Sequence, residues 1–215
     1  AKRAVEVGAK AIGLVRSEYL LPADENVPNA AFYRHSFREI CEAASPLTVT
    51  FRLLDVAADK KPKWLPRAQA MGQTLGLQGV RLYGYDPVQR VVDAQLAALS
   101  ELVNEFTIRL LIPFIVRLEE FDYWSALIER QFPDAVPVGA MAETLASVLD
   151  IAHLLEHADF VAIGCNDKAV VTGNPLEDEK AGFHWAYGRS DQFGGRVGVE
   201  DFSSPDRVSH IDIVY

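Results

Sequence analysis

Two kinds of hydrophobic pattern alternate along the chain. Stretches with apolar residues at i, i+3 and i+4 predict amphipathic helices, and the clearest spans residues 29–45, with Phe32, Tyr33 and Phe37 on one stripe. Short runs rich in aliphatic and β-branched residues predict strands. The predicted helices cover residues 1–10, 29–45, 87–105, 118–132 and 143–158. The predicted strands cover residues 11–15, 47–54, 79–82, 108–116, 136–141 and 159–165.

This alternation of strands with helices or long connections is typical of a parallel α/β fold. Several strands are apolar throughout, so both faces of the sheet are expected to be covered. An open doubly wound sheet and a closed barrel both fit the pattern. No G-x-G-x-x-G follows any predicted strand, which argues against the dinucleotide-binding version of the open sheet.

Composition narrows the function classes. The 215 residues predict one domain, and a net charge of −9 argues against a general nucleic-acid binder. The sequence contains no run of about 18 apolar residues, so no membrane span is expected. It also shows no signal peptide at its start. Cys41 and Cys165 form neither a metal-ligand spacing nor a disulfide framework, so a cytoplasmic location is expected. The start without Met and the strand-like end have two interpretations: residues 1–215 are one domain cut from a longer chain, or a sequence from which loops have been left out.

Charged and polar side chains follow most of the predicted strands. A single such residue commonly marks only the passage into solvent, but recurrence over five strands favours a shared site at the carboxyl ends. Glu143 and Asp167 offer hard oxygen ligands suited to Mg²⁺ or Mn²⁺. Arg16 and Arg52 offer planar guanidiniums that match phosphate or carboxylate. Together they predict a site for a phosphorylated acid. The complete set at the strand ends is Arg16, Glu18, Arg52, Asp55, Arg81, Glu143, Asn166 and Asp167.

Six segments, in order, resemble motifs of the C-terminal barrel of the phosphoenolpyruvate-utilising enzymes. That family includes pyruvate phosphate dikinase, phosphoenolpyruvate synthase and the first enzyme of the bacterial sugar phosphotransferase system. The resemblance covers about residues 1 to 168 and implies a (β/α)8 TIM barrel. The segments are AIGLVRSEYL, FRLLD, TLGLQGVRL, LIPFIVRLEEF, VPVGAMAET and FVAIGCND.

The resemblance also implies a chemistry. Arg16 and Arg52 would hold a phosphoryl group, Arg81 matches a further substrate-binding arginine, and Asn166 would bind a phosphate oxygen. Glu143 and Asp167 would hold Mg²⁺ or Mn²⁺. The family moves a phosphoryl group between phosphoenolpyruvate and a histidine on a separate domain, leaving pyruvate. It often dimerises through this barrel, so a homodimer is compatible with the resemblance.

The sequence departs from the family pattern in several places, including residues 168–170 and a later family arginine that has no clear match. Two departures matter most for the chemistry. Gln78 stands where the family has the first arginine of L-G-x-R-G-x-R. The G-M-C-G-E cysteine, the acid that protonates the enolate, has no counterpart in the seventh-strand candidate at residues 195–199, so the catalytic acid is unknown. An eighth strand is expected at residues 210–215, and the last two barrel units are expected to be irregular or incomplete.

These departures leave three functions open. The first is a magnesium-dependent phosphotransferase domain, and the second is a catalytically impaired binding or regulatory module of the same fold. The third is a metal-dependent lyase or aldolase that uses the pyruvate enolate. A helical pair, His153 and His157, has zinc-ligand spacing but no third ligand nearby, so a solvated helix face is the preferred interpretation.

Overall fold

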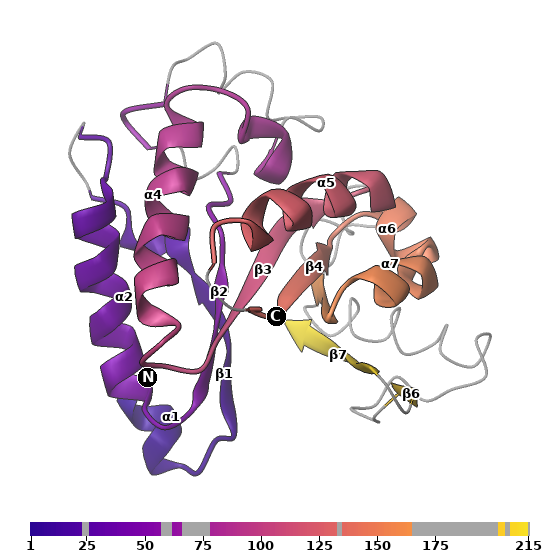
Figure 1. Ribbon diagram of the computed structural model, residues 1–215, viewed down its shortest axis with the longest axis horizontal. Helices are drawn as coiled ribbons and strands as arrows, with labels where there is room; N and C mark the ends of the chain where they lie inside the picture. The colour runs from indigo at the N-terminus through magenta and orange to yellow at the C-terminus, as the bar shows by residue number, and fades with distance from the viewer. Residues whose placement is uncertain are drawn as a thin grey trace, which may run out of the picture.

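The structure, a computed structural model, describes residues 1–22, 26–56, 62–65, 78–132, 135–164, 202–204 and 207–214. These residues form a curled sheet with helices packed along it (Figure 1). The strands lie in the spatial order β1, β2, β3, β4, β5, β7, β6, and all adjacent pairs are parallel except β6 with β7. The strands are β1 (Ala11–Arg16), β2 (Thr48–Arg52), β3 (Ile108–Ile115), β4 (Val138–Ala142), β5 (Phe160–Gly164), β6 (Phe202–Ser204) and β7 (Arg207–Val214).

The helices follow the predicted apolar stripes. In the second α-helix, Asn29 caps the start by accepting a hydrogen bond from the backbone N–H of Phe32, and Tyr33, Phe37 and Cys41 are buried on one side. The helices are α1 (Lys2–Glu6), α2 (Ala30–Ala44), α4 (Val88–Leu102), α5 (Leu118–Glu129), α6 (Leu145–Leu149) and α7 (Ile151–His157), with short 3-10 helices η1 (Ser17–Leu20) and η3 (Gly79–Leu82). In Figure 1, α2 and α4 lie side by side, and α5, α6 and α7 lie near β3 and β4.

The two faces of the sheet have different cores. Along β3, Ile108, Leu110 and Ile112 join the large cluster that the helices cover, which defines the outer face. Leu111 points to the other side, the inner face, where it packs in a smaller cluster. The inner cluster consists of Leu14, Leu111, Met141, Phe160 and Ala162. Burial on both faces confirms the expectation drawn from the continuously apolar strands.

The predicted strand at residues 79–82 is wrong, because these residues form η3. Gly79 has a φ of +54°, and the N–H groups of Arg81 and Tyr83 bond locally to the carbonyls of Gln78 and Val80. Such i to i+3 bonds use the backbone groups that a strand would offer to its neighbours. Accordingly β2 pairs directly with β3, with Val49 opposite Ile108.

Two other predictions changed in detail. The helix expected over residues 143–158 is two short helices, α6 and α7, that meet at Asp150. The strand expected at residues 210–215 is part of β7, which pairs with β5. The strand expected at residues 195–199 lies outside the described residues.

The architecture is that of a partial parallel barrel. Within the described ranges, six parallel strands form the curled sheet, and residues of β7 approach β1. Closure into eight strand–helix units stays a prediction. None of the helices in the described ranges is long and apolar enough to cross a membrane.

Candidate functional site

Two arginines lie next to each other at the carboxyl ends of β1 and β2. Arg16 is the last residue of β1 and Arg52 the last of β2, and their Cα atoms are register partners in the parallel ladder. The two side chains differ in exposure: that of Arg52 is 3% exposed and that of Arg16 is 30% exposed. Two guanidiniums at adjacent strand ends would repel each other without an anion between them.

Glu18 supplies that anion from within the chain. It lies in η1, directly after β1, and its side chain is 1% exposed. Its Oε1 accepts a hydrogen bond from Nε of Arg16 at 2.8 Å and another from Nη2 of Arg52. The ring of Tyr19 lies 4.7 Å from the guanidinium carbon of Arg16. The 3-10 turn after β1 therefore fixes Arg16 from two sides.

Arg52 is the centre of a buried charge cluster. Its Nη1 lies 3.0 Å from Oδ2 of Asp55 and 3.6 Å from Oε1 of Glu143, and Met141 Sδ is 3.5 Å away. Burial by itself lowers the pKa of Arg52, but the charges of Asp55, Glu18 and Glu143 outweigh it, so the pKa is raised overall. The guanidinium is therefore charged at every physiological pH.

Glu143 is held by backbone as well as by charge. It follows the last residue of β4, and its Oε2 accepts a hydrogen bond from the backbone N–H of Phe114 at 3.0 Å. Phe114 has a φ of 53°, which is uncommon for a residue with a side chain. A Cβ added to Gly164, at the end of β5, would lie 2.6 Å from Cγ of Glu143. Gly164 is therefore the residue whose small size makes room for the Glu143 side chain.

The cluster carries an excess of negative charge. It contains the guanidiniums of Arg16 and Arg52 and the carboxylates of Glu18, Asp55 and Glu143, which sum to 2 − 3 = −1 when all are ionised. Two buried polar atoms, Oε2 of Glu18 and Nε of Arg52, have no hydrogen-bond partner among the described residues. Buried polar atoms are nearly always bonded, so these two mark places where a further group would be stabilised.

Comparison with known proteins places this arrangement in a family. The family model for the PEP-binding domain of PEP-utilising enzymes matches residues 1–172. The chain belongs to this family. The site residues Arg16, Arg52 and Glu143 all lie within the matched segment.

Curated relatives named phosphoenolpyruvate-protein phosphotransferase are similar over the same part of the chain. The protein from Haemophilus influenzae is 28% identical over 170 residues, covering 74% of this chain and 29% of the relative. That from Cupriavidus necator is 32% identical over 177 residues, covering 76% and 30%. That from Bacillus subtilis is 25% identical over 176 residues, covering 77% and 30%. The chain thus spans about three tenths of the length of these relatives.

Three residues of the predicted site remain, namely Arg81, Asn166 and Asp167. Nε of Arg81, in η3, is 2.9 Å from Oε1 of Glu120 on α5, and its guanidinium carbon lies 5.9 Å from the ring of Phe114. Arg81 therefore lies near Phe114, the residue whose backbone N–H donates to Glu143. Asn166 and Asp167 lie outside the described residues.

Of the two predicted metal ligands, Glu143 lies in the described ranges and Asp167 does not. Those ranges contain no group of three or more His, Cys, Asp or Glu side chains arranged to hold a metal ion. The helical pair forms hydrogen bonds instead: Nδ1 of His153 with Asp150, and Nδ1 of His157 with Asp122 at 2.8 Å. The hydrogen bond with Asp150 raises the pKa of His153.

Sequence reasoning assigned binding roles to Arg16, Arg52 and Glu143 and gave no role to the residues that arrange them. Glu18 and Asp55 were recognised as charges at strand ends, and their spacings, R-x-E and R-x-x-D, were the available signal. Phe114 and Gly164 gave no such signal, because one donates through its backbone and the other matters through the absence of a side chain.

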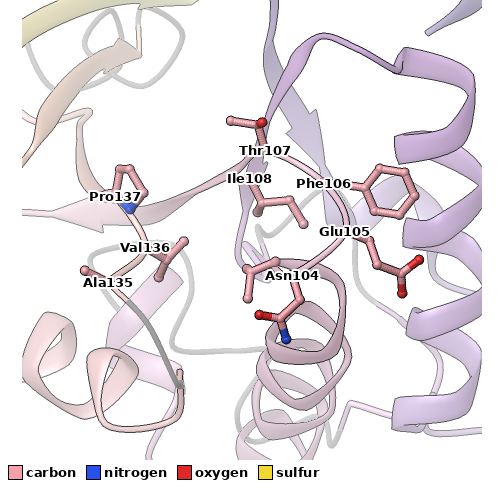
Figure 2. Close-up of a pocket in the computed structure, with 9 residues that line it drawn as sticks. Asn104, Glu105, Phe106, Thr107, Ile108, Ala135, Val136 and Pro137 are labelled. Carbon is pink, nitrogen blue, oxygen red and sulfur yellow. The ribbon is translucent and has the colours of Figure 1, made fainter.

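A sizeable cavity lies away from this cluster. It has a volume of about 380 Å³ and is formed by segments that lead into the amino ends of β3 and β4, among them residues 103–107 and 135–137. Figure 2 shows these residues gathered around it, with Ile108 at the beginning of β3. Because Arg52 and Glu143 lie at the opposite, carboxyl ends of their strands, the cavity and the candidate site are separate.

Proposed function

We propose that this chain is the phosphoenolpyruvate-binding domain of a magnesium-dependent phosphotransferase. In this proposal a phosphoryl group is exchanged between phosphoenolpyruvate and a histidine on a separate domain. The observation that carries the proposal is the meeting of Arg16, Arg52 and Glu143 at one edge of the sheet, in a chain of the PEP-binding family.

The two arginines would divide the work of binding the phosphoryl group. Arg52 is buried and fixed, and its Nε is a donor without a hydrogen-bond partner among the described residues. Arg16 is partly exposed, so its guanidinium can meet a ligand that arrives from solvent. Guanidiniums bind phosphate oxygens through charge-assisted hydrogen bonds and stabilise charge on the group being transferred.

The proposal includes a hard divalent cation. Glu143 and Asp167 would hold Mg²⁺ or Mn²⁺ through carboxylate oxygens, the ligand type these ions prefer. The net charge of −1 in the described cluster favours an added cation. When bound, the ion would neutralise charge on the phosphoryl and enolate oxygens. The hydrogen bond from Phe114 N–H orients Glu143 before any ion binds.

A second candidate function rests on Gln78. This residue begins η3 with extended backbone, at the position where the family motif has an arginine. A neutral amide supplies no charge to a phosphoryl group, so a binding or regulatory module with little transfer activity is the second candidate. Gln78→Arg tests it, because restoring the charge is expected to tighten phosphoenolpyruvate binding and raise any transfer rate.

Calorimetric titration tests the proposal directly. Phosphoenolpyruvate and oxalate, a mimic of the pyruvate enolate, are each titrated into the full-length protein with and without Mg²⁺. Both ligands are expected to bind only when Mg²⁺ is present, and Glu143→Gln is expected to abolish this metal-dependent binding. Glu101→Gln is the matched control, because Glu101 is exposed on α4 and pairs with Arg34.

The outcomes separate the candidates. Binding together with exchange of the pyruvate methyl protons supports the phosphotransferase, and binding without exchange supports the module. Turnover of pyruvate with aldehydes would indicate a lyase or aldolase instead. If neither ligand binds with Mg²⁺ present, the proposed function is wrong.

A further inference from the structure

We propose that Glu18 is a positioning residue that sets the separation and orientation of Arg16 and Arg52 for a phosphoryl group. The inference rests on the proposed function. It adds to the site a residue that does not contact the ligand but that the binding of the phosphoryl group would need. It is carried by one atom, Oε1 of Glu18, which accepts hydrogen bonds from both arginines.

The bridge joins two elements that backbone pairing alone does not orient. The ladder between β1 and β2 fixes the Cα atoms of Arg16 and Arg52, but each side chain has four rotatable bonds beyond Cα. The contact at Oε1 ties Nε of Arg16 and Nη2 of Arg52 to a common point. Because η1 begins directly after β1, Glu18 folds back over the strand end from which Arg16 extends.

The charge balance indicates that Glu18 contributes more than neutralisation. Without Glu18 the cluster would still hold two carboxylates, Asp55 and Glu143, for its two guanidiniums, a sum of 2 − 2 = 0, so overall neutrality does not require Glu18. Glu18 brings this sum to −1, which favours the proposed cation but, by charge alone, disfavours the phosphoryl anion. Its role is therefore better explained by the geometry of the bridge.

The two oxygens of Glu18 make different contacts, so the length and the charge of this side chain can be tested by separate substitutions. Oε1 makes both arginine contacts, and Oε2 is buried without a hydrogen-bond partner among the described residues. Glu18→Gln keeps the length of the side chain and a carbonyl oxygen that can accept both bonds, but removes the charge. Glu18→Asp keeps the charge but shortens the side chain by one methylene, so it cannot reach both guanidiniums.

The test compares these two variants by calorimetric titration of the full-length protein with phosphoenolpyruvate and Mg²⁺. Glu18→Gln is expected to bind within about threefold of the wild type, whereas Glu18→Asp is expected to lose on the order of 10- to 100-fold, as for a lost charge-assisted hydrogen bond. Oxalate has no phosphoryl group, so its affinity with Mg²⁺ is expected to be unchanged in both. Glu105→Asp is the control, because Glu105 also pairs with an arginine, Arg38, but on the exposed surface.

Three results would overturn the inference. They are unchanged phosphoenolpyruvate binding in Glu18→Asp, a larger loss in Glu18→Gln than in Glu18→Asp, and an equal loss of phosphoenolpyruvate and oxalate binding in Glu18→Asp. The last would indicate general damage to the site. If the wild-type protein binds neither phosphoenolpyruvate nor oxalate, the proposed function itself is wrong, and this result is distinct from the three above. Thermal unfolding of each variant verifies that it folds.

Discussion

The inner face of the sheet carries an arginine near each end, and the two ends are built differently. At the carboxyl ends, Arg52 is 3% exposed and lies among the carboxylates of Glu18, Asp55 and Glu143. At the amino ends, Nε of Arg109 donates to the hydroxyl of Thr50 at 3.0 Å, and its guanidinium carbon lies 4.4 Å from the ring centroid of Phe160. These two contacts of Arg109 involve neutral groups.

Each end also contains a glycine that makes room for a larger side chain. A Cβ on Gly164, at the carboxyl end of β5, would meet Glu143, whereas a Cβ on Gly139, near the amino end of β4, would meet the ring of Phe160 at 2.5 Å. A glycine thus leaves room for a charged side chain at one end of the sheet and for an aromatic ring at the other. The carboxyl ends thus place charged side chains together, where the ligand site is proposed, and the amino ends place an arginine beside neutral groups.

Removing each arginine gives the largest expected difference between the ends. Arg52→Met removes the buried cation that Glu18, Asp55 and Glu143 share, which is expected to lower the free energy of unfolding by about 3–5 kcal/mol. Arg109→Met removes the hydrogen bond to Thr50 and the contact with the ring of Phe160, and the loss of these two is expected to cost about 1–2 kcal/mol. Urea unfolding measures both.

Ligand binding gives the second half of that comparison. Arg109→Met is expected to bind phosphoenolpyruvate with Mg²⁺ like the wild type, whereas Arg52→Met is expected to lose binding even where it remains folded. Equal effects of the two substitutions on binding would contradict the functional difference between the ends.

Substituting each glycine sharpens the comparison with a smaller effect. Gly164→Ala and Gly139→Ala each add one methyl group against a side chain, and each is expected to cost about 1–3 kcal/mol of unfolding free energy through overpacking. Only Gly164→Ala displaces Glu143, so only this variant is expected to weaken Mg²⁺-dependent binding of oxalate. The measurement is calorimetry beside urea unfolding. Weaker oxalate binding in Gly139→Ala would be the opposite of what the structure indicates.

The strands and the neighbouring arginines could be predicted because they depend on local patterns. Continuously apolar runs predict strands buried on both faces, and parallel neighbours that both end in arginine bring Arg16 and Arg52 together. The prediction of a strand at residues 79–82 failed because the same apolar residues also suit a 3-10 turn. The positive φ of Gly79 decides between the two conformations. Apolar content alone does not contain that information.

The supporting residues of the site could not be predicted, for related reasons. The bridge at Glu18 depends on the 3-10 turn that follows β1, and an R-x-E spacing is equally compatible with two side chains that point into solvent. The N–H of Phe114 reaches Glu143 from a backbone conformation at φ 53° inside a run that looks like a regular strand. Tertiary packing selects both conformations, so neither has a signature in the local sequence.

A buried phenol beside the charged end gives the smallest expected effect. The hydroxyl of Tyr83 donates to the carbonyl of Leu54 at 2.9 Å, next to Asp55. Burial raises the pKa of Tyr83 well above its ordinary value of 10.0, and the charge of Asp55 raises it further. The folded protein therefore keeps this proton at a pH where the unfolded chain releases it. The resulting stability is fully present below about pH 10 and is lost as the pH rises above it.

Tyr83→Phe is accordingly expected to cost about 1 kcal/mol of unfolding free energy at pH 8, because the carbonyl of Leu54 loses its donor. Between about pH 10 and 11 the difference from the wild type is expected to shrink, since only the wild type loses the contribution of the phenol, by at most about 1.4 kcal/mol per pH unit. Urea unfolding at a series of pH values measures this. Tyr85→Phe is the control, because Tyr85 is 47% exposed and its substitution should leave the pH dependence unchanged. A constant difference between Tyr83→Phe and the wild type up to pH 11 would mean that the folded protein does not hold the Tyr83 proton more tightly than the unfolded chain.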